Sequence, residues 1–214
     1  MIMCFPRDMN HQAEGIEMNE ILDRILGEIG CPELMDRLSA LPGADRNSCL
    51  LELFRRRAEK LDPRAVLKSH SQSRFTAPSA LDPVRYRALE AELLTLARGR
   101  GMEPVLLSPV APLGSCSAFG CVNQNNVVSA ARGLEALADP TNMLALILTE
   151  RRKKGAPDAP VHLCATARVT RAQAFAGKNF FAHFGIFCLV SGGRDTGSYG
   201  CEAALLADQI GLYR

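Results

Sequence analysis

The stretch VHLCATARVTRAQAFAGKNFFAHFGIF, residues 161–187, decides the fold of this chain. Its first arm is an apolar run that carries Arg168 and Arg171, and its return arm is rich in phenylalanine. A loop around Gly177 separates the arms, and both arms have the period of a β-strand. The stretch therefore predicts a β-hairpin. An arginine inside an apolar sheet is costly to desolvate unless an anion meets it.

Arg171 is the first candidate binding residue. Its planar guanidinium can present two parallel donors to a carboxylate or a phosphate. Gln173, two positions later, is predicted to project from the same face of the strand and to orient the ligand. An alternative of equal weight is an internal ion pair between Arg171 and an acid such as Glu135 or Asp195.

The elements before the hairpin follow from periodicity and from glycine and proline. Residues 84–98 predict a helix that Gly99 ends, and residues 105–110 predict a strand whose Pro109 confines it to an edge or an interface. A short strand is expected around residues 133–138. Asp139 and Pro140 then predict the capped start of a buried helix of about 14 residues that ends at a basic cluster.

The polar segment 113–126 combines small residues with a run of amides. Such residues let a backbone approach a ligand closely, although a long surface loop is an equally good interpretation. We therefore expect Gln124 and Asn126 to contact a ligand, together with Thr141 and Asn142 at the start of the following helix.

Three regions are expected along the chain. Residues 1–67 predict three short amphipathic helices, and residues 68–83 have the polar, proline-bearing character of a linker or of an ordered arm. Residues 84–214 form the core domain. We predict an α+β fold, with a mainly antiparallel sheet flanked by helices and a helical N-terminal region.

Composition limits the compartment and the partners. The formal charge of +2 over 214 residues argues against a nucleic-acid binder held mainly by phosphate neutralisation. The basic cluster at residues 151–154 leaves RNA open as an alternative, although such a cluster is more typical of a solvated helix end. Eight cysteines, with no signal peptide and no long apolar span, favour reduced thiols in the cytoplasm and no membrane partner.

The order of these elements resembles the class II aminoacyl-tRNA synthetase catalytic core, above all its histidyl branch and the non-synthetase paralogues of that branch. In that family a first motif places a glycine before a strand that ends in proline and serves dimerisation; Gly101 and Pro109 are similar but one residue too far apart. In the second motif, Arg-x-Glu precedes a loop and an aromatic strand. Here Arg171-Ala172-Gln173 and Phe181-Ala182-His183-Phe184 resemble that pattern.

The sequence departs from the family at three points. Glutamine replaces the glutamate of the second motif, Lys178 is the only cation of the loop, and the glycine-rich third motif with its ATP-binding arginine is absent. No anticodon-binding domain is expected. The resemblance implies a reduced paralogue, a homodimer, that binds a small anionic metabolite such as an amino acid or a nucleotide. The resemblance does not identify the cofactor: it leaves open ATP with Mg²⁺, and it leaves open a ligase- or transferase-like activation or transfer.

Other sites and classes stay open. Arg194 and Asp195 lie in a glycine-rich run, residues 191–198, that predicts an anion-binding nest or, more often, a turn. A cysteine- or zinc-dependent enzyme is a second class, with His183 as a candidate acid or base. The candidate zinc ligands are Cys116, Cys121, His162 and Cys164. A non-catalytic interaction protein is the third class.

Overall fold

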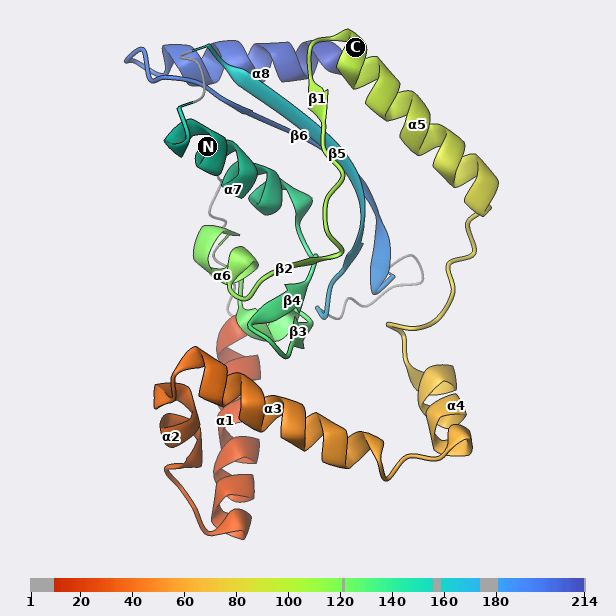
Figure 1. Cartoon of the computed structure of the whole chain (residues 1–214), viewed down its shortest axis with the longest axis vertical. Coiled ribbons are helices and arrows are strands. Elements are labelled where there is room, and N and C mark those ends of the chain that lie inside the picture. The colour runs from red at the N-terminus through yellow and green to blue at the C-terminus, as the bar shows by residue number, and fades with distance from the viewer. Residues whose placement is uncertain (1–9, 121, 156–158, 174–180, 214) are drawn as a thin grey trace. The chain divides into compact units, whose positions relative to one another are not determined.

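The computed structural model describes residues 10–120, 122–155, 159–173 and 181–213 (Figure 1), of which residues 10–19 are described by their backbone alone. Two compact units divide the chain. One contains His70–Ser129 and Leu134–Arg214, and the other contains the N-terminal helices up to Ser69. The predicted loop positions Gly177 and Lys178 lie outside the described residues, as does Cys121.

The main sheet has the predicted hairpin at its centre. Strand β5 (Val161–Thr170) pairs antiparallel with β6 (His183–Gly192), and the register joins Thr170 to His183 at one end. The short strand β1 (Glu103–Pro104) runs parallel to β5, so the strand order is β1-β5-β6. The α+β fold with an antiparallel hairpin is therefore confirmed.

The prediction of a continuous strand over residues 105–110 is wrong. The chain leaves the main sheet after β1, where the amide of Val105 donates to the carbonyl of Cys164 at 2.8 Å. A new strand, β2 (Val110–Pro112), pairs with β4 (Leu134–Ala136) in a second small sheet, which β3 (Ser129–Ala130) completes. Pro104 and Pro109 have no backbone N–H to donate to a neighbouring strand. This explains why the chain does not continue as one strand and passes from the main sheet to the second sheet.

Two helices of this unit begin at the same kind of cap. Asp82 accepts from the amides of Val84 and Arg85 at the start of α5 (Pro83–Gly99), and Asp139 accepts from Thr141 N at the start of α7 (Pro140–Lys153). Each helix has proline in its first turn, which suits a position that needs no N–H. The predicted cap and start of α7 are confirmed. A third helix, α8 (Gly200–Leu212), follows β6.

The two faces of the main sheet pack against different helices (Figure 1). Since side chains alternate along a strand, the odd-numbered residues of β5 face α7 and the even-numbered residues face α5 and α8. The α7 face buries the cluster of Leu144, Leu163, Ala165 and Cys188. The other face buries the cluster of Ala97, Met102, Cys164 and Leu212. The hairpin is thus covered on both sides.

The described residues of the segment 113–126 contact β4 of the second sheet. It contains the short helix α6 (Ser115–Gly120) and the 3-10 turn η1 (Gln124–Asn126). Glu135 of β4 is fully buried and accepts from Gly114 N at 2.8 Å, Cys116 N at 3.1 Å and Gln124 Nε2 at 3.0 Å. Three donors compensate the burial of this carboxylate, so the segment is an anchored structure and not a surface loop.

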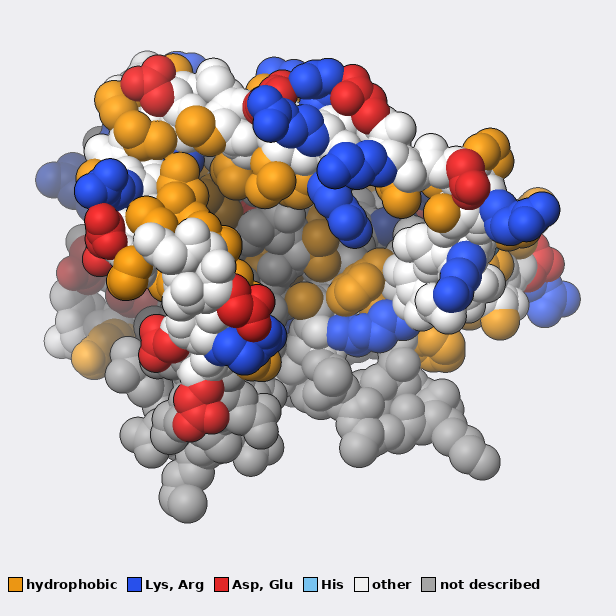
Figure 2. Space-filling view, turned by 90° about the horizontal axis from the view of Figure 1, so that it is seen from below, with side chains coloured by type: hydrophobic (Ala, Val, Ile, Leu, Met, Phe, Trp, Pro, Cys, Tyr) orange, Lys and Arg blue, Asp and Glu red, His pale blue; other side chains and the backbone are white. Residues whose placement is uncertain are grey.

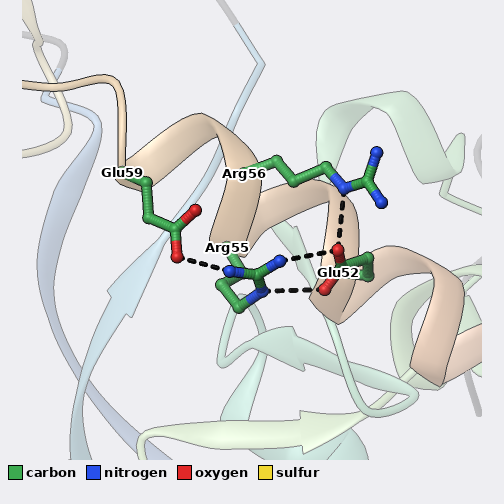
Figure 3. A network of polar contacts seen from close by, with 4 residues as sticks. All are labelled: Glu52, Arg55, Arg56 and Glu59. Atoms are coloured by element: carbon green, nitrogen blue, oxygen red, sulfur yellow. Dashed lines mark hydrogen bonds and ion pairs between the residues drawn. The ribbon is translucent and has the colours of Figure 1, made fainter.

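Helices form the N-terminal unit, as predicted. They are α1 (Asn10–Ile29), α2 (Leu34–Ala40) and α3 (Gly43–Ala58), while α4 (Pro63–Gln72) extends into the segment predicted as a linker. Exposed ion pairs join Arg55 to Glu52 and Glu59 on α3 (Figure 3), and Arg55 and Arg56 lower the pKa of Glu52 to about 2. Exposed pairs stabilise weakly. Among the described side chains of residues 20–69, Leu26 alone is buried.

Residues 73–82 run along one end of the hairpin as an ordered arm. The guanidinium of Arg74 donates to the carbonyls of Ala172 and Gln173, and the Nε2 of His183 contacts the carbonyl of Ala77 at 2.6 Å. These contacts join the arm to the residues that follow β5 and to the first residue of β6. Separately, none of the described helices combines the length and apolar character that a membrane span requires.

Candidate functional site

A small cavity opens where the end of β5, the start of α7 and the turn η1 come together. Its volume is about 130 Å³. The residues that line it are Cys116, Val122, Asn126, Val127, Ala138, Asp139, Arg171 and Gln173. Three of the sequence-based candidates, Arg171, Gln173 and Asn126, therefore share one cavity.

Arg171 follows β5 directly, and its amide still donates to the carbonyl of Ala182 at 2.8 Å. Its Nε donates to the carbonyl of Ala138 at 3.0 Å, and its guanidinium carbon lies 5.3 Å from the centre of the Phe184 ring. These contacts fix the plane of the guanidinium. The side chain is still 40% exposed, so its outer N–H groups can reach a ligand in the cavity.

Asp139 is the acid beside Arg171, in place of Glu135 or Asp195. Its Oδ2 lies 3.9 Å from the Arg171 guanidinium, while its Oδ1 accepts from the amide of Thr141 at 2.9 Å and from the Thr141 hydroxyl at 2.6 Å. Sequence reasoning assigned Asp139 only a capping role. Asp139 lies directly before α7, and two residues of the first turn of that helix, Thr141 and Asn142, were themselves predicted to contact a ligand. This proximity in the sequence could have identified Asp139.

The remaining wall of the cavity is apolar. Val127 and Ala138 are each 5% exposed, and Cys116 is 4% exposed. Burial raises the pKa of the Cys116 thiol to about 11, with smaller contributions from Glu135 and Asp139. The thiol is therefore protonated near neutral pH, which disfavours a nucleophilic role.

Other candidates support the cavity wall without lining it. Gln124 donates to the buried Glu135 and accepts from the Ser117 hydroxyl at 2.8 Å. The Nδ2 of Asn142 lies 3.9 Å from the Sγ of Cys116, and Thr141 binds Asp139. Through these contacts, the three residues stabilise the segments of the chain that contain the cavity-lining residues.

The structure does not bring three candidates to the cavity. His183 lies on the other face of the hairpin, where its Nδ1 contacts Arg168 and its Nε2 contacts Ala77. Arg194 and Asp195 follow β6 and are exposed, and Asp195 accepts from the amide of Gly197 at 2.7 Å in a turn.

The candidate zinc ligands are dispersed as far as the structure describes them. Cys116 lines the cavity, Cys164 belongs to the core that faces α5, and His162 Nδ1 contacts the Ser191 hydroxyl at 2.9 Å. Within the described ranges, no three His, Cys, Asp or Glu side chains form a group that could hold a metal ion.

The basic cluster at the end of α7 has acidic neighbours. Arg151 forms two hydrogen bonds with Glu103, at 2.6 and 2.8 Å, and Lys154 pairs with Glu150 at 2.6 Å. The pairing with Arg151 lowers the pKa of Glu103. On the face shown in Figure 2, acidic, basic and apolar side chains are interspersed. The cluster is therefore partly neutralised within the protein.

Comparison with known proteins finds solved structures that are similar to this chain. An ATP phosphoribosyltransferase regulatory subunit/histidyl-tRNA synthetase from Bacillus halodurans C matches 64% of this chain and 36% of its own, with 16% identity and a TM-score of 0.46. Histidyl-tRNA synthetase from Nostoc sp. PCC 7120 matches 65% and 34%, with 21% identity and a TM-score of 0.43. Pyrrolysyl-tRNA synthetase from Desulfitobacterium hafniense matches 58% and 45%, with 13% identity and a TM-score of 0.46.

The chain thus spans between about a third and a half of the length of these structures. No protein-family model and no curated protein matches the chain. The solved structures named above are histidyl- and pyrrolysyl-tRNA synthetases and one ATP phosphoribosyltransferase regulatory subunit/histidyl-tRNA synthetase, each less than 25% identical to this chain.

Proposed function

We propose that the cavity at the end of β5 binds a small anionic metabolite through Arg171. One observation carries the proposal: Nε of Arg171 is held by a backbone carbonyl, while the rest of the guanidinium borders a cavity and is not neutralised by a close carboxylate. An ion pair at 3.9 Å between two partly exposed side chains is weak. The arginine is thus oriented in advance and remains available for an anion.

The motif resemblance implies an amino acid or a nucleotide as the ligand and leaves activation or transfer open as the reaction. The described residues do not fit ATP with Mg²⁺. Among the described residues that line the cavity, Asp139 carries the single carboxylate and faces an arginine, and Gln173 stands where the motif has glutamate. The volume of about 130 Å³ is also below the roughly 300–1,000 Å³ of pockets that hold drug-sized ligands. We therefore propose binding and derive no step through ATP.

Gln173→Glu tests descent from the synthetase motif. If the pocket retains an ATP-binding ancestry, the restored carboxylate should produce measurable Mg²⁺-ATP binding in calorimetry. A Gln173→Glu protein that binds no ATP leaves the anion site intact and removes the argument for activation.

The proposal extends to a homodimer in the cytoplasm. The strand β1 lies at an edge of the main sheet, and Leu106, two residues after it, is 97% exposed. An apolar side chain beside a sheet edge is a liability unless a partner covers it. Light scattering at micromolar concentration should find a dimer that Leu106→Ser weakens, and a monodisperse wild-type monomer would contradict the assignment.

Two measurements test the proposed function. Mass spectrometry of the native protein should find a co-purified small anion, and a thermal-shift screen with amino acids, short carboxylates, phosphate and nucleotides should raise Tm with at least one of them. A protein that no anion stabilises would instead support the class of non-catalytic interaction protein. Metal analysis of the same sample tests the zinc class.

A further inference from the structure

One histidine joins the middle of the arm, residues 73–82, to the hairpin. His183 is the first residue of β6, and its Nε2 lies 2.6 Å from the carbonyl oxygen of Ala77 in the arm. Its Nδ1 contacts the guanidinium of Arg168 on β5. We propose that His183 is a pH switch, which holds the arm while the imidazole is neutral and releases it when the ring gains a second proton.

The two partners of the ring determine its protonation state. A carbonyl oxygen only accepts hydrogen bonds, so Nε2 must carry a hydrogen in order to bind Ala77. A guanidinium only donates, so Nδ1 must be the unprotonated nitrogen that accepts from Arg168. The observed arrangement therefore requires the neutral ring, in the tautomer with its hydrogen on Nε2.

A second proton removes the acceptor of this arrangement. The new N–H on Nδ1 would face the N–H groups of Arg168, and two cations would then lie in contact in a partly buried cluster, where like charges repel. The pairing of His183 with Thr170 fixes the backbone of the histidine, so the ring itself must turn. A ring that turns away from Arg168 also takes Nε2 away from Ala77.

The arm has firm attachments at its two ends and few between them. Arg74 donates to the carbonyls of Ala172 and Gln173, at 3.2 Å to the latter, and Asp82 caps α5. Residues 75–81 are all exposed. Apart from the contact of Ala77 with His183, their hydrogen bonds, as far as the structure describes them, join residues no more than six positions apart. Loss of the His183 contact should therefore free the middle of the arm.

The switch depends on which groups near the arm change charge. The titratable and charged side chains of the described elements in this region are Arg168 of β5, Tyr86, Arg87 and Glu90 of α5, Arg74 of the arm and His70 of α4. Glu90 already pairs with Arg87 at 2.7 Å. Histidine is the side chain that ordinarily changes charge between pH 8 and 5. His183 and His70 are thus the two candidates for a response in this range.

His70 is the less sensitive of these two histidines. Its Nδ1 contacts the Thr76 hydroxyl at 3.1 Å. A hydroxyl can accept as well as donate, so this contact persists whether or not the ring of His70 carries a second proton. The contact of His183 with a guanidinium, in contrast, permits only the neutral ring.

Nuclear magnetic resonance of the full-length protein tests the switch in one titration from pH 8 to pH 5. The ring nitrogen signals report the protonation of His183, and backbone order parameters report the motion of the arm. At pH 8 the order parameters of residues 75–77 should be near the roughly 0.85 of a rigid backbone. They should fall below about 0.6, the range of a flexible backbone, as His183 gains its proton.

Two variants serve as matched controls. In His183→Gln, the amide can donate to the carbonyl of Ala77 and accept from Arg168, but it gains no proton in this range. The arm of this variant should stay ordered at pH 5. His70→Asn removes the other histidine near the arm and should leave the wild-type transition unchanged.

The outcomes decide the proposal without any ligand in the cavity, so they are independent of the proposed function. A wild-type arm that stays ordered down to pH 5 refutes the switch, and so does an arm that loosens equally in His183→Gln. A transition that disappears in His70→Asn assigns the response to His70 and also refutes it. Should His183→Gln fail to fold, the wild type and His70→Asn still decide the question.

Discussion

Arg168 and Arg171 lie three residues apart on one arm of the hairpin, yet they have different surroundings. Arg168 is on the α5 face, where it contacts the Nδ1 of His183 and lies 5.7 Å from the centre of the Tyr86 ring. Arg171 is on the α7 face, where its Nε binds a backbone carbonyl and the side chain borders a cavity. One arginine completes a packed cluster, and the other is available for a ligand.

The difference arises from segments that are remote in sequence. The Arg168 face receives Tyr86 from α5 and the arm residue Ala77, and these fill the space beside the strand. Opposite Arg168 in the register is Gly185, whose missing side chain leaves room for the tyrosine. The Arg171 face receives the N-terminus of α7, where Asp139 uses one oxygen as a cap. A packed face and an open site thus share one pair of strands.

The largest effect is expected from Gly185→Ala, which disrupts the packed face. An added Cβ would lie 1.8 Å from the hydroxyl oxygen of Tyr86, so the tyrosine must move and its packing is lost. Urea denaturation should show a loss of about 2–3 kcal/mol in the free energy of unfolding. The control is Gly211→Ala in α8, where nothing lies within 4 Å of the added Cβ. An unchanged stability for Gly185→Ala would mean that Tyr86 does not pack there in solution.

Arg171→Lys disrupts the open face, with a smaller expected effect. A lysine keeps the charge but cannot reproduce the planar fork, so affinity for the best anion of the screen should fall by about tenfold, or roughly 1.4 kcal/mol. Stability should change by less than about 0.5 kcal/mol, since the pair with Asp139 is partly exposed. Arg168→Lys is the control and should leave the affinity unchanged. Equal losses of stability and affinity in Arg171→Lys would indicate an internal salt bridge.

The sequence predicted the hairpin and α7 because their signals are local. Alternating apolar residues specify β5 and β6, and Asp139 before Pro140 specifies a capped helix. The strand at residues 105–110 failed because proline at both ends divides it between two sheets. The apolar pattern of one segment indicates a strand but does not indicate which sheet each end of that segment joins.

The composition of the site was predictable only in part. Arg171 was predicted as a candidate because a cation in an apolar strand is unusual, and Gln173 followed by alternation; both line the cavity. Asp139 lines the same cavity but was not among the candidates, because its local role as a cap explained it completely. His183 was assigned a chemical role that its surroundings, Arg168 and Ala77, do not require. Which face of a strand meets open space depends on long-range packing, and periodicity does not contain that information.

The smallest expected effect is a pH dependence of the packed face. Burial and a hydrogen bond with Glu90 raise the pKa of Tyr86 above 10, its ordinary value. A group whose pKa is higher in the folded state stabilises the fold while it is protonated. The ionisation of Tyr86 should therefore not affect the free energy of unfolding below pH 10. Above pH 10, the free energy of unfolding should fall as the pH rises through the raised pKa of Tyr86. Tyr86→Phe removes the ionisation but keeps the ring, so chemical denaturation between pH 9 and 11 should show a shallower decline than in wild type. If both proteins lose stability in parallel, the tyrosine is not buried against Gly185, and the contrast between the two faces of the hairpin would rest on Arg171 alone.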